Sequence, residues 1–169
     1  MQNNQTTINI ARFIGLLLLQ VIVLNHINFL GYINPYAYLI FILLFPFDGS
    51  KILLIFLSFL LGLSIDFFAD SGGVHAAASV FAGFLRPVLL KFSFGVSYEY
   101  NAVKLNKVTL QKRLLYITLM VLIHHFVLFS LEIFSAAHLL LILKSTLFSG
   151  VFSVLLILCA LLLFTTKEN

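Results

Sequence analysis

The feature that most constrains the fold of this chain is a succession of long apolar stretches separated by short polar connections. Six stretches can be drawn, at approximately residues 8–30, 32–48, 51–68, 74–94, 114–134 and 138–164. A membrane-spanning helix needs about 20 apolar residues, with roughly 17 as a practical minimum. The pattern therefore predicts an all-α polytopic membrane protein, with six transmembrane helices forming a single transmembrane domain over residues 1–169.

The composition argues against an ordinary soluble fold. Of the 169 residues, 62% are hydrophobic and only 9% are charged, whereas a soluble domain carries about 25% charged residues. A soluble protein this apolar could not cover its surface with polar side chains, so lipid is the expected solvent. The net charge of +4 is then interpreted as a determinant of membrane topology, and no nucleic-acid partner is expected.

The second stretch is barely long enough to cross a membrane and could instead be re-entrant. With six crossings and a cytoplasmic N-terminus, most of the basic residues fall on or near the cytoplasmic side: Arg12, Lys51, Lys91, Lys104, Lys107, Lys112, Arg113 and Lys167. The outer connections, around residues 28–34, 70–73 and 135–137, contain no Lys or Arg. A re-entrant second stretch would move the basic residues 91–113 outside, against the positive-inside rule. Six crossings with both termini in the cytoplasm are therefore predicted.

Small and polar side chains recur along the third and fourth predicted helices. The third carries a residue of this kind every four positions: Ser58, Gly62, Asp66 and Asp70. The fourth carries four on one face: His75, Ser79, Ala82 and Arg86. Polar groups inside spans normally face other helices or a cavity. We expect Asp66, Asp70, His75 and Arg86 to form a structural polar cluster that shapes a partner-binding face, and a proton or ion site is the alternative.

The last two predicted helices carry further polar residues. Glu132 and Lys144 lie at comparable depth in adjacent antiparallel helices, which predicts an ion pair. The sixth helix also has Ser145, Ser149 and Ser153 at intervals of four. The adjacent His124 and His125 are candidate metal ligands, but neighbouring helical residues point about 100° apart and no Cys or His set completes a tetrahedral site. No metal or cofactor is expected.

The remaining sequence features indicate where the predicted spans begin and end, and none of them indicates catalysis. The six tyrosines lie at or beside predicted span ends, where amphipathic rings favour the headgroup region: Tyr32, Tyr36, Tyr38, Tyr98, Tyr100 and Tyr116. Asn34-Pro35 predicts the start of the second helix. The sequence has no glycine-rich phosphate loop and no nucleophile elbow. No catalytic residue is expected, and the protein is predicted not to be an enzyme.

Two local stretches, together with the length and the six spans, resemble the rod shape-determining protein MreD family over nearly the whole chain. The first is residues 25–36, with the sequence NHINFLGYINPY. The second is residues 62–68, GLSIDFF, followed by residues 72–78, GGVHAAA, and residues 84–87, FLRP. It is similar to the family's Gly-Leu-x-x-Asp, Gly-x-His-Ala and downstream Arg pattern. This sequence has two glycines before the histidine where the family usually has one, and Asp70 is additional.

The resemblance implies a non-enzymatic scaffold of the bacterial cell-elongation (rod) complex in the inner membrane, involved in cell shape and lateral peptidoglycan synthesis. The implied partners are an MreC-like bitopic protein and, directly or indirectly, MreB-type filaments and the elongation synthase, a class B penicillin-binding protein with a SEDS glycosyltransferase. The implied fold is similar to the substrate-binding subunits of energy-coupling-factor transporters. The alternative is a small-solute-binding membrane transporter subunit, and a membrane enzyme acting on lipid-linked substrates is a third hypothesis.

Overall fold

Runs of Leu, Ile and Phe form long helices here because only intrahelical hydrogen bonds satisfy the backbone against lipid. The structure, a computed structural model, describes residues 2–31, 33–46, 49–95 and 108–165. Its elements are α1 (Gln2–Ile22), η1 (Leu24–His26), α2 (Leu39–Leu44), α3 (Lys51–Ala69), α4 (Val74–Phe94), α5 (Leu110–Ile133), η3 (Ala136–His138) and α6 (Leu139–Thr165). Within these residues there is no β-strand, only an isolated bridge between Phe29 and Ile33. The predicted all-α class is confirmed.

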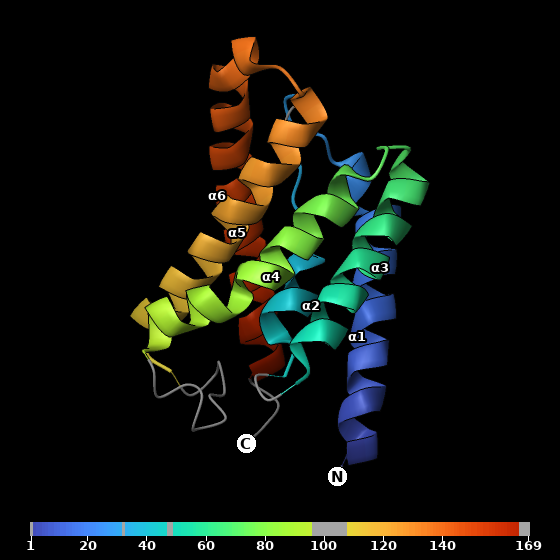
Figure 1. Cartoon of the computed structure of the whole chain (residues 1–169), viewed down its shortest axis with the longest axis vertical. Coiled ribbons are helices and arrows are strands. Elements are labelled where there is room, and N and C mark those ends of the chain that lie inside the picture. Colours follow the sequence, from blue (N-terminus) through green and yellow to red (C-terminus); the bar gives the residue numbers. More distant parts are fainter. Residues whose placement is uncertain (1, 32, 47–48, 96–107, 166–169) are drawn as a thin grey trace.

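Among the described residues, five helices are long and apolar enough to cross a membrane, at Thr6–His26, Lys51–Ala69, Val74–Phe94, Leu110–Ile133 and Ala136–Leu162. They correspond to five of the six predicted spans, and the third and fourth agree with the prediction to within one residue. The chain therefore has the architecture of a multi-pass membrane protein. In Figure 1, α1 begins and α6 ends at the same end of the bundle, here called the lower end, and the α3–α4 and α5–α6 turns lie at the upper end.

The second predicted span is not a long helix, and six transmembrane helices is in this respect a wrong prediction. Residues 33–46, here called the buried return segment, connect the upper end of α1 with the lower end of α3 (Figure 1). Only Leu39–Leu44 within them is α-helical, so the helix begins four residues after Pro35 and not at Asn34-Pro35. The described part of the chain still passes along the bundle six times, because this segment makes the second pass without being a full helix.

The length of the buried return segment explains its mixed backbone. A helix of 14 residues rises only about 21 Å, less than the roughly 30 Å thickness of the hydrocarbon core. Non-helical residues rise up to about 3.3 Å each, so the same number of residues reaches further. Irregular backbone at membrane depth is tolerated only where protein surrounds it, and Tyr36–Leu43 is buried throughout. This segment is the centre of the core.

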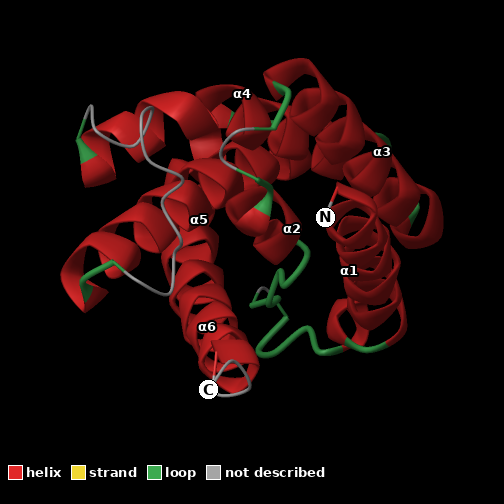
Figure 2. Cartoon of the chain, turned by 90° about the horizontal axis from the view of Figure 1, so that it is seen from below, coloured by secondary structure: helices red, strands yellow, loops and turns green. Residues whose placement is uncertain are grey.

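The long helices surround the buried return segment. Consecutive helices α3, α4, α5 and α6 pack against one another in chain order, and α1 packs on α3 and α2. Seen from below, the connection after α1 runs between α1 and α6 before it enters α2 (Figure 2). Tyr36, Tyr38 and Tyr116 are at most 4% exposed, so their rings face the interior of the bundle. Tyr98 and Tyr100 lie outside the described residues, as does Tyr32.

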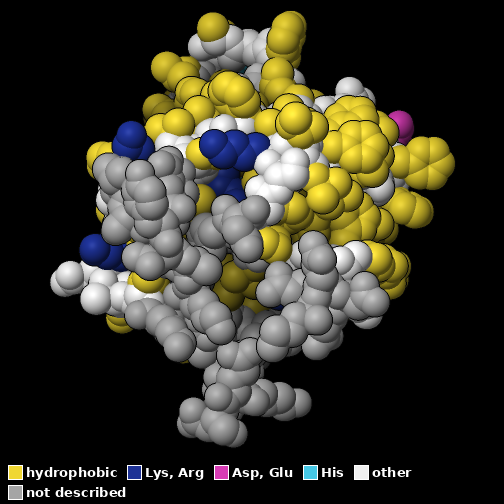
Figure 3. All heavy atoms as spheres, turned by 60° about the horizontal axis from the view of Figure 1, so that its bottom comes forward, with side chains coloured by type: hydrophobic (Ala, Val, Ile, Leu, Met, Phe, Trp, Pro, Cys, Tyr) yellow, Lys and Arg dark blue, Asp and Glu magenta, His cyan; other side chains and the backbone are white. Residues whose placement is uncertain are grey.

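Most of the described basic side chains lie toward the lower end, and Lys144, near the start of α6, is the exception. At the lower end, α3 begins with Lys51, α4 has Lys91 in its last turn, and α5 has Lys112 and Arg113 in its first turn. Figure 3 shows basic side chains at this end and hydrophobic ones over the flanks. This distribution matches the charge pattern used to predict topology; Lys104, Lys107 and Lys167 lie outside the described residues.

Candidate functional site

The upper half of the buried return segment is held by side chains from α1 and α6. The Gln20 amide donates to the Pro35 carbonyl at 3.2 Å and accepts from the Ala37 N–H at 3.0 Å. On α6, the Ser149 hydroxyl accepts from the Asn34 N–H at 3.2 Å. One turn further, Ser153 accepts from the Tyr36 N–H at 2.9 Å. These polar side chains therefore replace the intrahelical bonds that a non-helical backbone lacks.

The lower half is held by two guanidinium groups. Arg86 of α4 donates to the Phe45 carbonyl, to the Leu43 carbonyl at 3.5 Å, and to the Tyr116 hydroxyl at 3.1 Å. Arg12 of α1 donates to the Leu44 carbonyl at 3.4 Å. The last carbonyls of a helix have no intrahelical partner and carry partial negative charge. These acceptors compensate the positive charge of Arg86, which is only 4% exposed inside the bundle.

Asp66 and His75 are in direct contact at the upper end of α3 and α4. One carboxylate oxygen of Asp66 accepts from the His75 backbone N–H at 3.0 Å, lies 2.9 Å from His75 Nδ1, and accepts from the Ser71 hydroxyl at 2.5 Å. The other accepts from the Ala76 N–H at 2.8 Å. A negative charge beside a helix N-terminus is stabilised by the orphan N–H groups and the helix dipole. Asp66 therefore caps α4 from the preceding helix.

The close approach of α3 and α4 depends on Gly62. A Cβ atom added there would lie 2.5 Å from the Cα of Ala76 and 2.5 Å from the His75 carbonyl oxygen. Both are backbone atoms, so no side-chain rotation could relieve the contact. The α3–α4 turn uses left-handed backbone at Asp70, Gly72 and Gly73, which explains the paired glycines of the sequence. Gly62 and this turn together bring Asp66 to the start of α4.

The other predicted site residues lie elsewhere. Asp70 ends α3 with an exposed side chain and does not contribute its carboxylate to the Asp66–His75 contact. Arg86 is 11 residues beyond His75, about 16 Å along the helix, and bonds to the return segment, so it does not join a single cluster with Asp66. The predicted Glu132–Lys144 ion pair does not form: both side chains are exposed, and the one salt bridge within the described residues is Asp66–His75.

A second group of buried polar rings was not anticipated. The Tyr38 hydroxyl lies 2.7 Å from Nε2 of His124, and Nε2 of His125 lies 3.0 Å from the Ser153 hydroxyl. The Tyr36 ring packs edge-on against His125 with centroids 5.1 Å apart. Both histidines are fully buried. Their partners belong to the return segment and α6, and within the described residues no three His, Cys, Asp or Glu side chains are placed to hold a metal.

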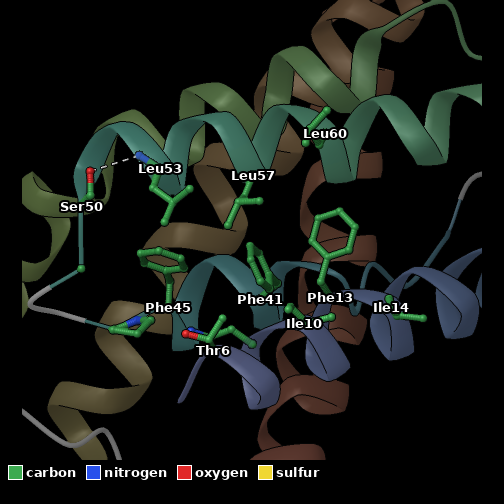
Figure 4. A pocket seen from close by; sticks show the side chains of 13 residues that line it. Thr6, Ile10, Phe13, Ile14, Phe41, Phe45, Ser50, Leu53, Leu57 and Leu60 are labelled. Carbon is green, nitrogen blue, oxygen red and sulfur yellow. Dashed lines mark hydrogen bonds between the residues drawn. The ribbon is translucent and has the colours of Figure 1, made fainter. Parts of the chain in front are cut away.

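A lateral cavity of about 770 Å³ lies between α1, α2 and the lower half of α3. Figure 4 shows its apolar side chains converging from three sides: Phe13 from α1, Phe41 and Phe45 from α2 and its end, and Leu53, Leu57 and Leu60 from α3. Its polar lining includes Thr6, Asn9 and Ser50. The polar residues predicted as a site take no part in this lining.

The polar side chains named above therefore bond to other parts of the same chain. Asp66 is the one buried carboxylate among the described residues, and both of its oxygens are engaged by donors of the same chain. Arg86, Gln20, Ser149 and Ser153 bond to the return segment. No protein-family model, curated protein or solved structure matches this chain.

Proposed function

We propose that this chain is a non-enzymatic scaffold of the bacterial cell-elongation complex in the inner membrane, with both termini in the cytoplasm. In this role it binds an MreC-like bitopic partner and supports lateral peptidoglycan synthesis and cell shape. The proposal starts from the MreD-like residues Gly62, Asp66, His75 and Arg86. Its fold, on the same resemblance, is similar to the substrate-binding subunits of energy-coupling-factor transporters.

One observation carries this proposal: the four MreD-like residues all maintain the chain's own architecture. Gly62 permits the close approach of α3 and α4, Asp66 and His75 join them at the upper end, and Arg86 holds the return segment. A motif of this kind suits a protein that presents a rigid shape, since both Asp66 carboxylate oxygens and the Arg86 guanidinium bond to groups of the chain itself. Scaffolding through the membrane needs such a shape and no reacting group.

The outward surfaces suit lateral association. α1 is the least buried of the five long helices, and α6 exposes Leu147, Val151 and Leu155 on its outer side. Transmembrane helices associate through van der Waals packing of complementary faces, so a single helix of a bitopic partner is a suitable ligand. The basic lower end would face the cytoplasm and MreB-type filaments, and the upper turns would face the elongation synthase.

The test combines partner capture with a cell-shape assay. A photo-crosslinking residue is placed at Val151 on α6 or at Leu18 on α1, both exposed, and the adducts formed in native membranes are identified. We expect an adduct with an MreC-like protein from at least one helix, and rounding of rod-shaped cells when the chain is depleted. Unchanged cell width after clean deletion without a paralogue would refute the proposal. Recovery of an ATPase module would favour the transporter subunit.

A further inference from the structure

The length of the lateral cavity distinguishes between two kinds of occupant, a transmembrane helix of a partner and a lipid acyl chain. Along α3 its lining extends from Ser50 to Leu60, ten residues or about 15 Å. This is half of the roughly 30 Å hydrocarbon core, so the cavity covers one leaflet and ends near the middle of the membrane. A transmembrane helix of a partner would need a groove along both leaflets. A lipid acyl chain occupies only one.

The cavity also matches an amphipathic ligand in polarity. Its deep part is lined by Phe and Leu side chains, and Thr6 and Ser50 lie toward its lower end (Figure 4). Asn9, which also lines it, is three residues after Thr6 on α1. Its volume of about 770 Å³ falls in the range of roughly 300–1,000 Å³ typical of small-ligand sites. An apolar chain with a polar head at the lower end fits this gradient.

Two cations stand at the polar end. Half-buried Arg12 donates to the Asn9 side chain at 3.3 Å, and exposed Lys51 follows Ser50 at the start of α3. Within the described residues neither has a carboxylate at salt-bridge distance, and Asp48 lies outside them. Each basic residue near an anionic lipid surface contributes about 1 kcal/mol, or roughly five-fold in affinity. The charge therefore favours an anionic headgroup over a zwitterionic one.

We propose that this cavity binds one anionic phospholipid of the leaflet at the lower end, with an acyl chain between α1 and α3 and the phosphate beside Arg12 and Lys51. The lipid fills the space between α1 and α3 and so supports α1, the helix with the least protein around it. This site is independent of partner binding on the outer faces, so either proposal can fail without the other.

The first test measures lipid retention by native mass spectrometry of the purified full chain. The protein is given equal amounts of phosphatidylglycerol and phosphatidylcholine. We expect preferential retention of one phosphatidylglycerol, a preference about five-fold weaker in Lys51→Gln, and loss of both lipids in Leu57→Trp, which fills the cavity. Two matched controls should behave as wild type. Lys112→Gln removes a basic residue of the same end on α5, and Leu155→Trp adds a large side chain on the outer side of α6.

Several outcomes would overturn the lipid site. An equal loss of preference in Lys112→Gln and Lys51→Gln would mean that the whole basic end attracts the lipid. Unchanged retention in Leu57→Trp would place the lipid outside the cavity, and Lys51→Gln, at an exposed position, remains informative if the Trp variant fails to fold. A photo-crosslinking residue at Leu53 gives a second readout: a lipid adduct supports the site, whereas a partner protein or a second copy of the chain contradicts it.

Discussion

The Ser153 hydroxyl on α6 accepts a hydrogen bond from the backbone N–H of Tyr36, joining residues 117 positions apart at 2.9 Å. Ser153 lies on the last helix, and Tyr36 lies in the segment that makes the second pass. A serine within an apolar span here provides the hydrogen-bond acceptor that a helical Tyr36 would have found in its own helix. The polar side chains of the long helices thus make an irregular pass possible inside a membrane protein.

Removing this acceptor should destabilise the protein. Ser153→Ala removes the partner of both the Tyr36 N–H and His125 Nε2, and each buried group left unsatisfied costs about 1–3 kcal/mol. The apparent melting temperature in detergent, measured by size-exclusion chromatography of heated samples, should fall. Ser64→Ala is the matched control, since Ser64 bonds only to the Leu60 carbonyl of its own helix. Equal melting temperatures for the two variants would contradict the assigned role of Ser153.

The two carboxylates at the upper end of α3 should respond differently to neutralisation. Asp66→Asn keeps the size of the side chain but loses the charge that four donors surround, and hydrogen bonds to charged groups contribute about 1.5–3 kcal/mol each. Asp70→Asn alters an exposed side chain and should stay within about 0.5 kcal/mol. Thermal stability of both variants in detergent measures the difference. A larger loss in Asp70→Asn would show that the exposed carboxylate is the important one.

The α3–α4 contact should not tolerate a methyl group. Gly62→Ala places a Cβ against the backbone of α4, and overpacking of this kind costs about 1–3 kcal/mol or more. Gly15→Ala on α1 has open space around its new Cβ and should be neutral or slightly stabilising, because Ala has the higher helix propensity. The same melting assay compares them, and similar results for both would argue against close packing at Gly62.

Arg86 should not be replaceable by lysine. Its guanidinium reaches two carbonyls and the Tyr116 hydroxyl at once, whereas the single ammonium of lysine cannot reproduce this planar arrangement of donors. We expect Arg86→Lys to increase hydrogen exchange in Leu39–Leu44, measured by mass spectrometry. Lys91→Gln, five residues further along α4 with an exposed side chain, should leave exchange unchanged. Equal protection in wild type and Arg86→Lys would contradict the role of Arg86.

The predicted topology can be tested with single cysteines in a Cys159→Ala background. A cysteine in place of Gly72, at the upper turn, should be labelled by a membrane-impermeant maleimide added to the periplasmic side. A cysteine in place of Gln111, at the start of α5, should be labelled only after the membrane is opened. The reverse pattern would invert the orientation, and labelling of both positions from one side would contradict the five long crossings.

Much of the fold follows from the sequence, because apolar length and turn residues define α3 and α4 directly. The second pass does not follow in the same way: hydropathy reports that residues 32–48 are apolar but not whether lipid or protein surrounds them. Its shortness and Asn34-Pro35 were compatible with a short helix. Gln20 and the serines of α6 were the available signal, since polar side chains at membrane depth require partners.

The site was predictable only where its parts are close in sequence. The contact between Asp66 and His75 bridges a short turn, so helix periodicity brings them together. The contacts of Arg86 and Tyr38 depend on how distant helices are arranged around the return segment, which periodicity does not define. Glu132 and Lys144 were assigned to each other from depth alone, but rotation about each helix axis turns both outward.

The dependence of the second pass on α4 and α6 affects how the chain is made. Synthesis proceeds from the N-terminus, so residues 33–46 leave the ribosome before Arg86 and long before Ser149 and Ser153. Before those residues are made, the N–H groups of Asn34 and Tyr36 lack the acceptors that they have in the complete protein. Unsatisfied backbone groups are costly in lipid. The second pass therefore reaches its final state last, when α6 closes around a segment made near the beginning.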